Sequence, residues 1–147
     1  MRISSKGRYA LAAMVEMALT DSGDYQAIIS LSQKLGISKI YLEQVFSILK
    51  RSGLVQSEKG ARGGYKLRRA PSDIKVLDIL KPLELALFEQ ADDQVGDDAP
   101  EIGDALTDLV FSKMDEAILR VLESVTLADL AQRVGGERAA RGYMYYI

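Results

Sequence analysis

The sequence predicts a mainly α-helical fold with one small β-hairpin, and three observations support this prediction. Residues 28–53 contain two short amphipathic helix patterns with a glycine between them. Residues 54–67 alternate apolar and polar side chains on both sides of a glycine-rich loop, which is typical of a hairpin. Residues 101–124 form one long amphipathic stripe. The expected fold class is therefore a winged helix-turn-helix followed by a long dimerisation helix.

The first helix is expected over about residues 5–19, with Met14 and Val15 on its buried face. Polar and basic residues gather where this helix begins, namely Ser4, Ser5, Lys6, Arg8 and Tyr9. The unpaired backbone N–H groups of a helix start, its dipole and nearby lysine and arginine side chains all attract a phosphate group. We therefore expect these residues to contact the DNA backbone. The alternative is an ordinary capped helix start that faces solvent.

Two short helices with a tight turn follow. Gly36 ends the first, because glycine readily adopts the left-handed conformation, and Ser38 is a good N-cap for the second. Gly53 ends the second helix. One face of this second helix is expected to be buried, through Leu42, Val45, Phe46 and Leu49. Such a pair can place its second helix in the major groove of DNA.

The hairpin that follows carries basic residues near its tip. Lys59 and Arg62 lie in the loop beside Gly63, and Lys66 lies in the second strand. A basic hairpin beside a groove-reading helix suits contact with phosphates and with the minor groove. The alternative is a tight hairpin with ordinary solvated charges. Its position directly after the helix pair favours a nucleic-acid contact.

Charge is distributed unevenly along the chain. Residues 1–69 contain 12 Lys and Arg against 5 Asp and Glu, a net charge of +7. Residues 70–147 contain 7 Lys and Arg against 16 Asp and Glu, a net charge of −9, and the two halves sum to the overall −2. The basic half suggests a module that binds a polyanion. The acidic half is expected to hold a dimer, sense a signal or bind a partner.

The composition excludes several classes of function. The chain has no cysteine and no histidine, so thiolate metal sites, cysteine nucleophiles and histidine general bases are all excluded. We expect no metal, no cofactor and no enzymatic activity, since an enzyme would need a carboxylate pair in a cleft. The sequence contains no run of about 18 apolar residues, so no membrane span is predicted. The N-terminus lacks a signal-peptide pattern, so a cytoplasmic protein is expected.

The region after the hairpin is acidic. A short helix is expected over about residues 76–80, ending near Pro82, and residues 82–100 then form a connector rich in carboxylates. These carboxylates are Glu84, Glu89, Asp92, Asp93, Asp97 and Asp98. Clustered oxygens can bind Ca²⁺, but the spacing of a calcium-binding loop is missing. A solvated acidic face is therefore expected.

The long helix is expected over residues 101–124. Its apolar stripe is assigned to dimerisation through Ile102, Leu106, Leu109, Val110, Ile118 and Val121. A winged-helix core does not need a helix of this length to cover it, and two-fold dimers suit palindromic operators. Packing of the stripe within one chain is the alternative.

A short helix capped by Thr126 is expected next, broken by Gly135 and Gly136. The chain then ends in RGYMYYI, whereas chain ends are normally polar and frayed. Two interpretations are open. The aromatic end packs on its own dimer, or it is a peptide ligand whose terminal carboxylate is held by backbone N–H groups of another protein.

Three stretches carry a resemblance to a known family: RISSKGRYALAAM, KIYLEQVFSILKRSGLV and GARGGYKL. They resemble the Rrf-type winged-helix transcriptional regulators. Cluster-binding members carry three cysteines in the connector, and this chain has none. The ending, LESVTLADLA followed by GYMYYI, resembles the cluster-free branch of cysteine-metabolism repressors. The resemblance implies a homodimeric repressor of sulfur and cysteine genes, with cysteine synthase (O-acetylserine thiol-lyase) as a co-repressor bound through Tyr145, Tyr146 and Ile147.

The resemblance also implies which residues read DNA. The groove readers would be Ser38, Lys39, Tyr41, Glu43 and Gln44, and the wing would contribute Lys59, Arg62 and Gly63, with Arg62 entering the minor groove. Glu43 can accept a hydrogen bond from the cytosine N4 amine, and Gln44 can bond adenine N6 and N7. A helix-surface salt bridge between Glu43 and Lys39 or Lys50 is the alternative.

The expected organisation is a DNA-binding region at 1–81, an acidic connector at 82–100, and a dimerisation helix with a partner-binding tail at 101–147. Two alternatives to the repressor are open. One is a winged-helix regulator that answers a different signal. The other is a winged-helix interaction module that binds protein and never touches DNA.

Overall fold

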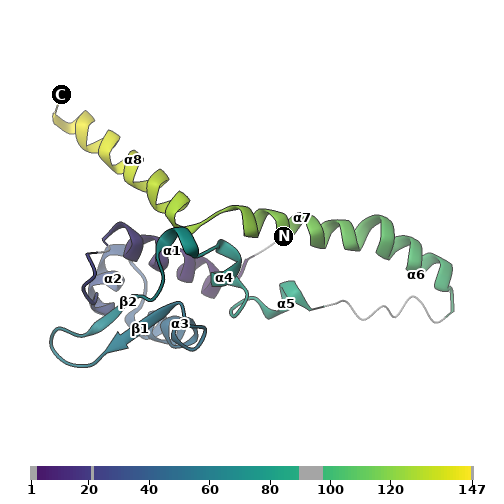
Figure 1. Ribbon diagram of the computed structural model, residues 1–147, viewed down its shortest axis with the longest axis horizontal. Coiled ribbons are helices and arrows are strands. Elements are labelled where there is room, and N and C mark those ends of the chain that lie inside the picture. Colours follow the sequence, from purple (N-terminus) through teal and green to yellow (C-terminus); the bar gives the residue numbers. More distant parts are fainter. Residues whose placement is uncertain (1–2, 21, 90–97, 147) are drawn as a thin grey trace.

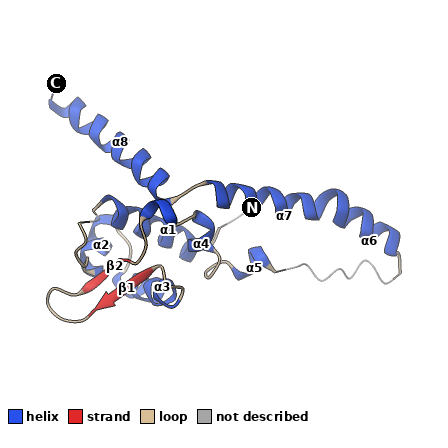
Figure 2. Ribbon diagram, viewed as in Figure 1, coloured by secondary structure: helices blue, strands red, loops and turns tan. Residues whose placement is uncertain are grey.

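The computed structural model describes residues 3–20, 22–89 and 98–146, without the side chains of Tyr145 and Tyr146 (Figure 1). Ile147 and the connector carboxylates Asp92, Asp93 and Asp97 lie outside the described residues. The elements in chain order are α1 (Ser5–Leu19), α2 (Ile28–Leu35), α3 (Lys39–Arg51), β1 (Val55–Glu58), β2 (Gly64–Leu67), η1 (Pro71–Asp73), α4 (Val76–Leu80), α5 (Leu85–Phe88), α6 (Pro100–Leu106), η2 (Thr107–Phe111), α7 (Ser112–Ser124) and α8 (Leu127–Tyr146). The predicted fold class, mainly helical with one hairpin, is confirmed (Figure 2).

Helix α1 lies at the centre of the predicted DNA-binding region, against α2, α3, α4 and α8. Its small and flexible residues Ala10, Ala13, Met14 and Met17 are fully buried, which lets the neighbouring helices approach closely. The core around it includes Leu31, Leu42, Val45, Phe46, Leu49, Leu54, Val55, Ile74, Ile79 and Leu127. Leu127, the first residue of α8, belongs to this core, so the start of the last helix packs against the N-terminal elements.

The helix pair α2 and α3 follows the sequence prediction closely. Gly36 ends α2 in the left-handed conformation, with φ of 65°, and Ser38 caps α3 by accepting a hydrogen bond from the Tyr41 N–H at 3.4 Å. The four residues predicted for the inner face of α3 are all buried. Phe46 on that face packs against Tyr65 of the hairpin, with ring centroids 4.9 Å apart. The wing is thereby fixed relative to α3.

Strands β1 and β2 form the predicted antiparallel hairpin, with Val55 opposite Leu67 and Glu58 opposite Gly64. A further pair of backbone hydrogen bonds, each 2.8 Å long, joins Gln26 to Tyr65. Gly64 has φ of 142°, and a Cβ atom there would collide with the Gln26 carbonyl. Glycine is therefore required where the loop before α2 crosses the wing.

The segments α6, η2 and α7 make one continuous helical rod that projects away from the DNA-binding region (Figure 1). The predicted long helix is confirmed, with one addition. Residues Thr107–Phe111 form a π-helical turn, a wider turn that changes the angular position of the residues after it. The base of the rod contacts α4, and Val76 N–H donates to the Val125 carbonyl at 2.9 Å.

Helix α8 corrects the prediction of a short helix broken at Gly135 and Gly136. The helix runs unbroken from Leu127 to Tyr146. Thr126 and Asp129 cap its start reciprocally, at 2.9 and 3.1 Å, as the sequence indicates. A mid-helix glycine costs only about 1 kcal/mol relative to alanine, and packing of α8 on α1 offsets that cost. The C-terminal end of α8 projects beyond the DNA-binding region (Figure 1).

Candidate nucleic-acid interface

The exposed face of α3 carries the predicted groove readers. Lys39, Glu43 and Gln44 are exposed, and Ser38 is exposed at the capped start of the helix. This face borders a surface hollow of about 500 Å³. The hollow is lined by Lys6 of α1 and by Ile40, Glu43, Gln44, Ser47, Ile48 and Arg51 of α3. The structure therefore brings the start of α1 and the outer face of α3 to one surface.

Glu43 forms the salt bridge that the sequence left open as an alternative. Its carboxylate lies 3.6 Å from the Lys39 ammonium group, and both side chains are largely exposed. Exposed ion pairs one helical turn apart contribute only about 0.3–0.5 kcal/mol. The pair can therefore open at little cost, which leaves the Glu43 carboxylate free to accept a hydrogen bond from a base edge.

Tyr41 is half-buried, whereas Lys39, Glu43 and Gln44 are exposed. Its ring packs edge-to-face on Tyr9 of α1, with centroids 5.2 Å apart and planes 80° apart. The two tyrosines thus join the start of α1 to the start of α3. This contact helps to hold the start of α1 and the start of α3 in a fixed relation.

The start of α1 differs from the open anion site that the sequence suggested. The Ser4 N–H donates to Glu84 Oε1 at 2.8 Å, and the Ser4 hydroxyl donates to the same oxygen. That hydroxyl also accepts from the Gly7 N–H at 3.1 Å. A carboxylate of this chain therefore occupies the helix start, and Ser4 acts as a cap. Lys6 and Arg8, which are exposed, retain side chains that can reach a phosphate.

Glu84 also corrects the expectation of a uniformly solvated acidic connector, since it is buried. Gly7 leaves room for it, because a Cβ atom at Gly7 would collide with Glu84 Oε1. Ser5 is engaged locally, accepting a hydrogen bond from Arg8 at 3.2 Å. Among the residues predicted to contact DNA at the start of α1, Ser4 and Ser5 therefore make hydrogen bonds within the chain, whereas Lys6 and Arg8 are exposed.

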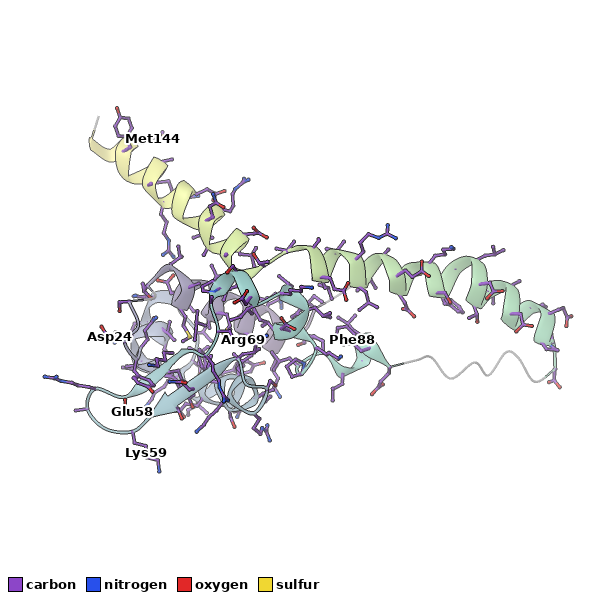
Figure 3. The ribbon with its side chains drawn as sticks, viewed as in Figure 1. Asp24, Glu58, Lys59, Arg69, Phe88 and Met144 are labelled. Atoms are coloured by element: carbon purple, nitrogen blue, oxygen red, sulfur yellow. The ribbon has the colours of Figure 1, made fainter. Side chains whose placement is uncertain are left out.

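The loop of the wing carries its basic residues outward. Lys59 points away from the molecule, and Arg62 is also exposed (Figure 3). Gly63 is needed for the shape of the turn, because a Cβ atom there would collide with the Glu58 carbonyl. Lys66 lies over the Tyr25 ring, 4.7 Å from its centroid, so its ammonium group has an aromatic partner within the chain.

The predicted dimerisation stripe is largely uncovered in a single chain. Exposed members of the stripe are Ile102, Leu106, Leu109, Val110 and Val121. Ile118, the remaining member, is half-buried and lines a small cavity of about 190 Å³ with Leu87 and Phe88 of α5. Phe88 lies beside the base of the rod (Figure 3). Ile118 therefore has neighbours within its own chain, and its assignment to the dimer interface stays a prediction.

The tail helix α8 is anchored by a buried carboxylate. Glu16 of α1 accepts a hydrogen bond from Arg138 at 2.8 Å and lies 3.6 Å from the Lys34 ammonium group. The hydrogen bond from Arg138 and the two positive charges hold the pKa of the Glu16 carboxyl below its usual value, against the opposing effect of burial. Beyond this anchor, Tyr143 and Met144 are exposed near the end of α8 (Figure 3).

The described residues contain no group of three or more acidic side chains arranged to hold a metal ion. Within the same residues, no helix is long and apolar enough to cross a membrane.

Comparison with known proteins places the chain in a family. The Rrf2 family model, described as an iron-dependent transcriptional regulator, matches residues 3–133. The HTH-type transcriptional regulator CymR of Bacillus subtilis (strain 168) is 37% identical over 147 residues, which is 100% of each chain. The structure of CymR, the global cysteine regulator of B. subtilis, superimposes with a TM-score of 0.75 at 34% identity, covering 90% of this chain and 98% of that one.

The structure of T. potens IscR is equally similar, with a TM-score of 0.75, 37% identity, and coverage of 99% of this chain and 97% of that one. The family match, the full-length relative and the winged-helix arrangement of α2, α3 and the hairpin agree. This chain belongs to the Rrf2 family of DNA-binding transcriptional regulators and is not an enzyme.

Proposed function

We propose that this protein is a dimeric, cytoplasmic repressor of sulfur and cysteine metabolism genes that acts with a cysteine synthase bound through its C-terminal tail. The observation that carries the DNA-binding part is the single surface on which Lys6 of α1 and the outer face of α3 meet, within the half of the chain that has a net charge of +7. Polar base readers flanked by basic residues are the arrangement that duplex DNA requires.

Within this surface the roles divide by chemistry. Lys6, Arg8 and Lys59 are assigned to phosphates, because an exposed ammonium or guanidinium group neutralises backbone charge without reading sequence. Glu43 and Gln44 are assigned to base edges. Arg62, exposed at the wing, is assigned to the minor groove, where arginine responds to groove width and electrostatic potential.

Dimerisation is supported by the rod of α6, η2 and α7. Its exposed apolar side chains lie along this one rod, and an exposed apolar patch of this kind normally marks an interaction surface. A second copy is the simplest occupant, because two-fold dimers are the commonest assembly and present two recognition helices to a palindromic operator.

The assignment to sulfur metabolism is supported by similarity to the global cysteine regulator CymR over the whole chain. Similarity to IscR is comparable. A chain without cysteine cannot hold a cysteine-ligated cluster, which argues against a function like that of the cluster-binding members of the family.

The gene assignment can be tested by selecting native genomic fragments that the purified protein retains. We expect enrichment of fragments upstream of sulfur-uptake and cysteine-biosynthesis genes, with loss of that enrichment for Gln44→Ala. Gln33→Ala, at an exposed glutamine on α2, is the matched control and should behave as the wild type. Enrichment upstream of unrelated genes would favour a regulator with a different signal. Retention of no fragment would favour the protein-interaction module.

The partner assignment rests on the tail. Beyond the Arg138 anchor, α8 ends in exposed Tyr143 and Met144, and the sequence closes with Tyr145, Tyr146 and Ile147. A short apolar peptide with a terminal carboxylate can enter a preformed pocket with both a buried side chain and a charged anchor.

Capture of cysteine synthase from native extract, with and without Ile147, tests this assignment. Deletion of Ile147 should abolish capture and leave operator binding intact, and O-acetylserine should compete because it would occupy the same pocket. Arg133→Ala, on an exposed turn of the same helix, is the control and should capture the enzyme normally. If Ile147 deletion lowers thermal stability while neither form captures the synthase, the tail packs on its own dimer instead.

A further inference from the structure

One large apolar side chain interrupts the polar face of α3. Ile40 is the second residue of the helix and is 69% exposed, whereas the helix's other large apolar residues face the core or are half-buried. A single exposed isoleucine is common on an ordinary protein surface. On a helix face whose neighbours are Lys39, Glu43 and Gln44, it supplies a kind of contact that the polar residues cannot supply.

The position of Ile40 places it with the base readers. It precedes Glu43, Gln44 and Ser47 by three, four and seven residues, and residues at these spacings share one helix face. The same four residues line the hollow of about 500 Å³, together with the basic residues Lys6 and Arg51. Ile40 also lies in the first turn of α3, and the N-terminal residues of a recognition helix are those that reach base edges.

The major groove offers one apolar group to such a side chain. Adenine, guanine and cytosine present donors and acceptors there, whereas thymine adds its C5 methyl group. Glu43 and Gln44 have hydrogen-bonding chemistry suited to cytosine and adenine. An aliphatic side chain beside them would add thymine to the bases that this face of α3 can recognise.

We propose that Ile40 packs against the C5 methyl group of a thymine in the major groove and thereby specifies thymine at one position of each half-site. This inference rests on the proposed function in one respect, namely that α3 enters the major groove. It adds to that function a specificity-determining residue that the sequence pattern did not single out, although its spacing from Glu43 and Gln44 was visible.

The test isolates the methyl group chemically. A preferred duplex is first selected from random sequences with the wild-type protein, and each thymine is then replaced in turn by deoxyuridine, which lacks only that methyl group. At one symmetric pair of positions, we expect a loss of about 3- to 10-fold in affinity per methyl group, as burial of one methyl-sized apolar group would give.

The variant Ile40→Ala should bind the thymine duplex more weakly and should no longer distinguish it from the deoxyuridine duplex at that position. Ile29→Ala is the matched control, because Ile29 is also an exposed isoleucine, 48% exposed, but lies on α2. The control should retain the full penalty for deoxyuridine. Since both side chains are exposed, neither change removes a buried side chain, and equal melting temperatures would show that both variants fold.

Two results would overturn the inference alone: no thymine position sensitive to deoxyuridine in the wild type, or an unchanged penalty in Ile40→Ala. Failure to select any duplex, accompanied by no salt-dependent binding to unrelated DNA, would overturn the DNA-binding function and this inference together.

Discussion

Leu109→Asp is expected to convert the dimer to a monomer and to abolish operator binding. Leu109 is 75% exposed in the single chain, so the substitution leaves the fold of one subunit intact. In a two-fold dimer the change places an unpaired carboxylate on each side of the interface. Leaving a buried charge uncompensated costs about 3–5 kcal/mol, or roughly 10²- to 10⁴-fold in dissociation constant. Light scattering after size-exclusion chromatography measures the mass directly.

The matched control for this prediction is Leu85→Asp. Leu85 is also an exposed leucine, 66% exposed, but it lies on α5 and outside the stripe. This variant should elute as a dimer and bind DNA. If Leu109→Asp also eluted as a normal dimer, the stripe would face solvent or another element, and the assembly would have to form elsewhere.

The stripe shows where sequence periodicity reaches its limit. The 3–4 spacing correctly predicted a long amphipathic helix over residues 101–124. Spacing alone cannot tell whether a member of the stripe meets a partner chain or a neighbouring segment of the same chain. In the structure Ile118 is half-buried and lines a cavity with Leu87 and Phe88 of α5, a neighbouring segment that the spacing did not indicate.

The winged helix-turn-helix was predictable because its signals are local. Gly36 ends α2, Ser38 caps α3, and glycines shape the wing within a few residues of the features they control. Each of these residues acts through its own backbone conformation or through a hydrogen bond to a near neighbour. Such effects are fully contained in a short stretch of sequence.

The interactions that the sequence did not predict join residues far apart in the chain. Glu84 accepts a hydrogen bond from the Ser4 N–H 80 residues away, and Arg138 reaches Glu16 across 122 residues. No local pattern distinguishes either residue from the surface charges beside it. The continuity of α8 through Gly135 and Gly136 has the same origin, since it depends on packing against α1 rather than on intrinsic helix propensity.

Contacts within the chain also involve several residues of α1 that the sequence assigned to DNA. Ser4 and Ser5 are engaged within α1 or by Glu84, and Tyr9 packs on Tyr41. Lys6 and Arg8 of α1 are both exposed, and we propose that they contact phosphates. Removing a phosphate interaction made by either of these basic side chains would weaken binding to all sequences about equally.

The central claim is that the basic half of this chain binds duplex DNA. The most direct test is to measure how the affinity for a selected operator depends on salt concentration. If a dimer neutralises about 6–10 phosphates, its affinity should fall by about 10³- to 10⁵-fold between roughly 50 and 200 mM salt. Arg8→Ala should reduce the slope by about one for each phosphate that the arginine no longer neutralises, whereas Arg133→Ala on α8 should leave the slope unchanged. An affinity that does not change with salt, or the absence of any DNA binding at low salt, would contradict the claim.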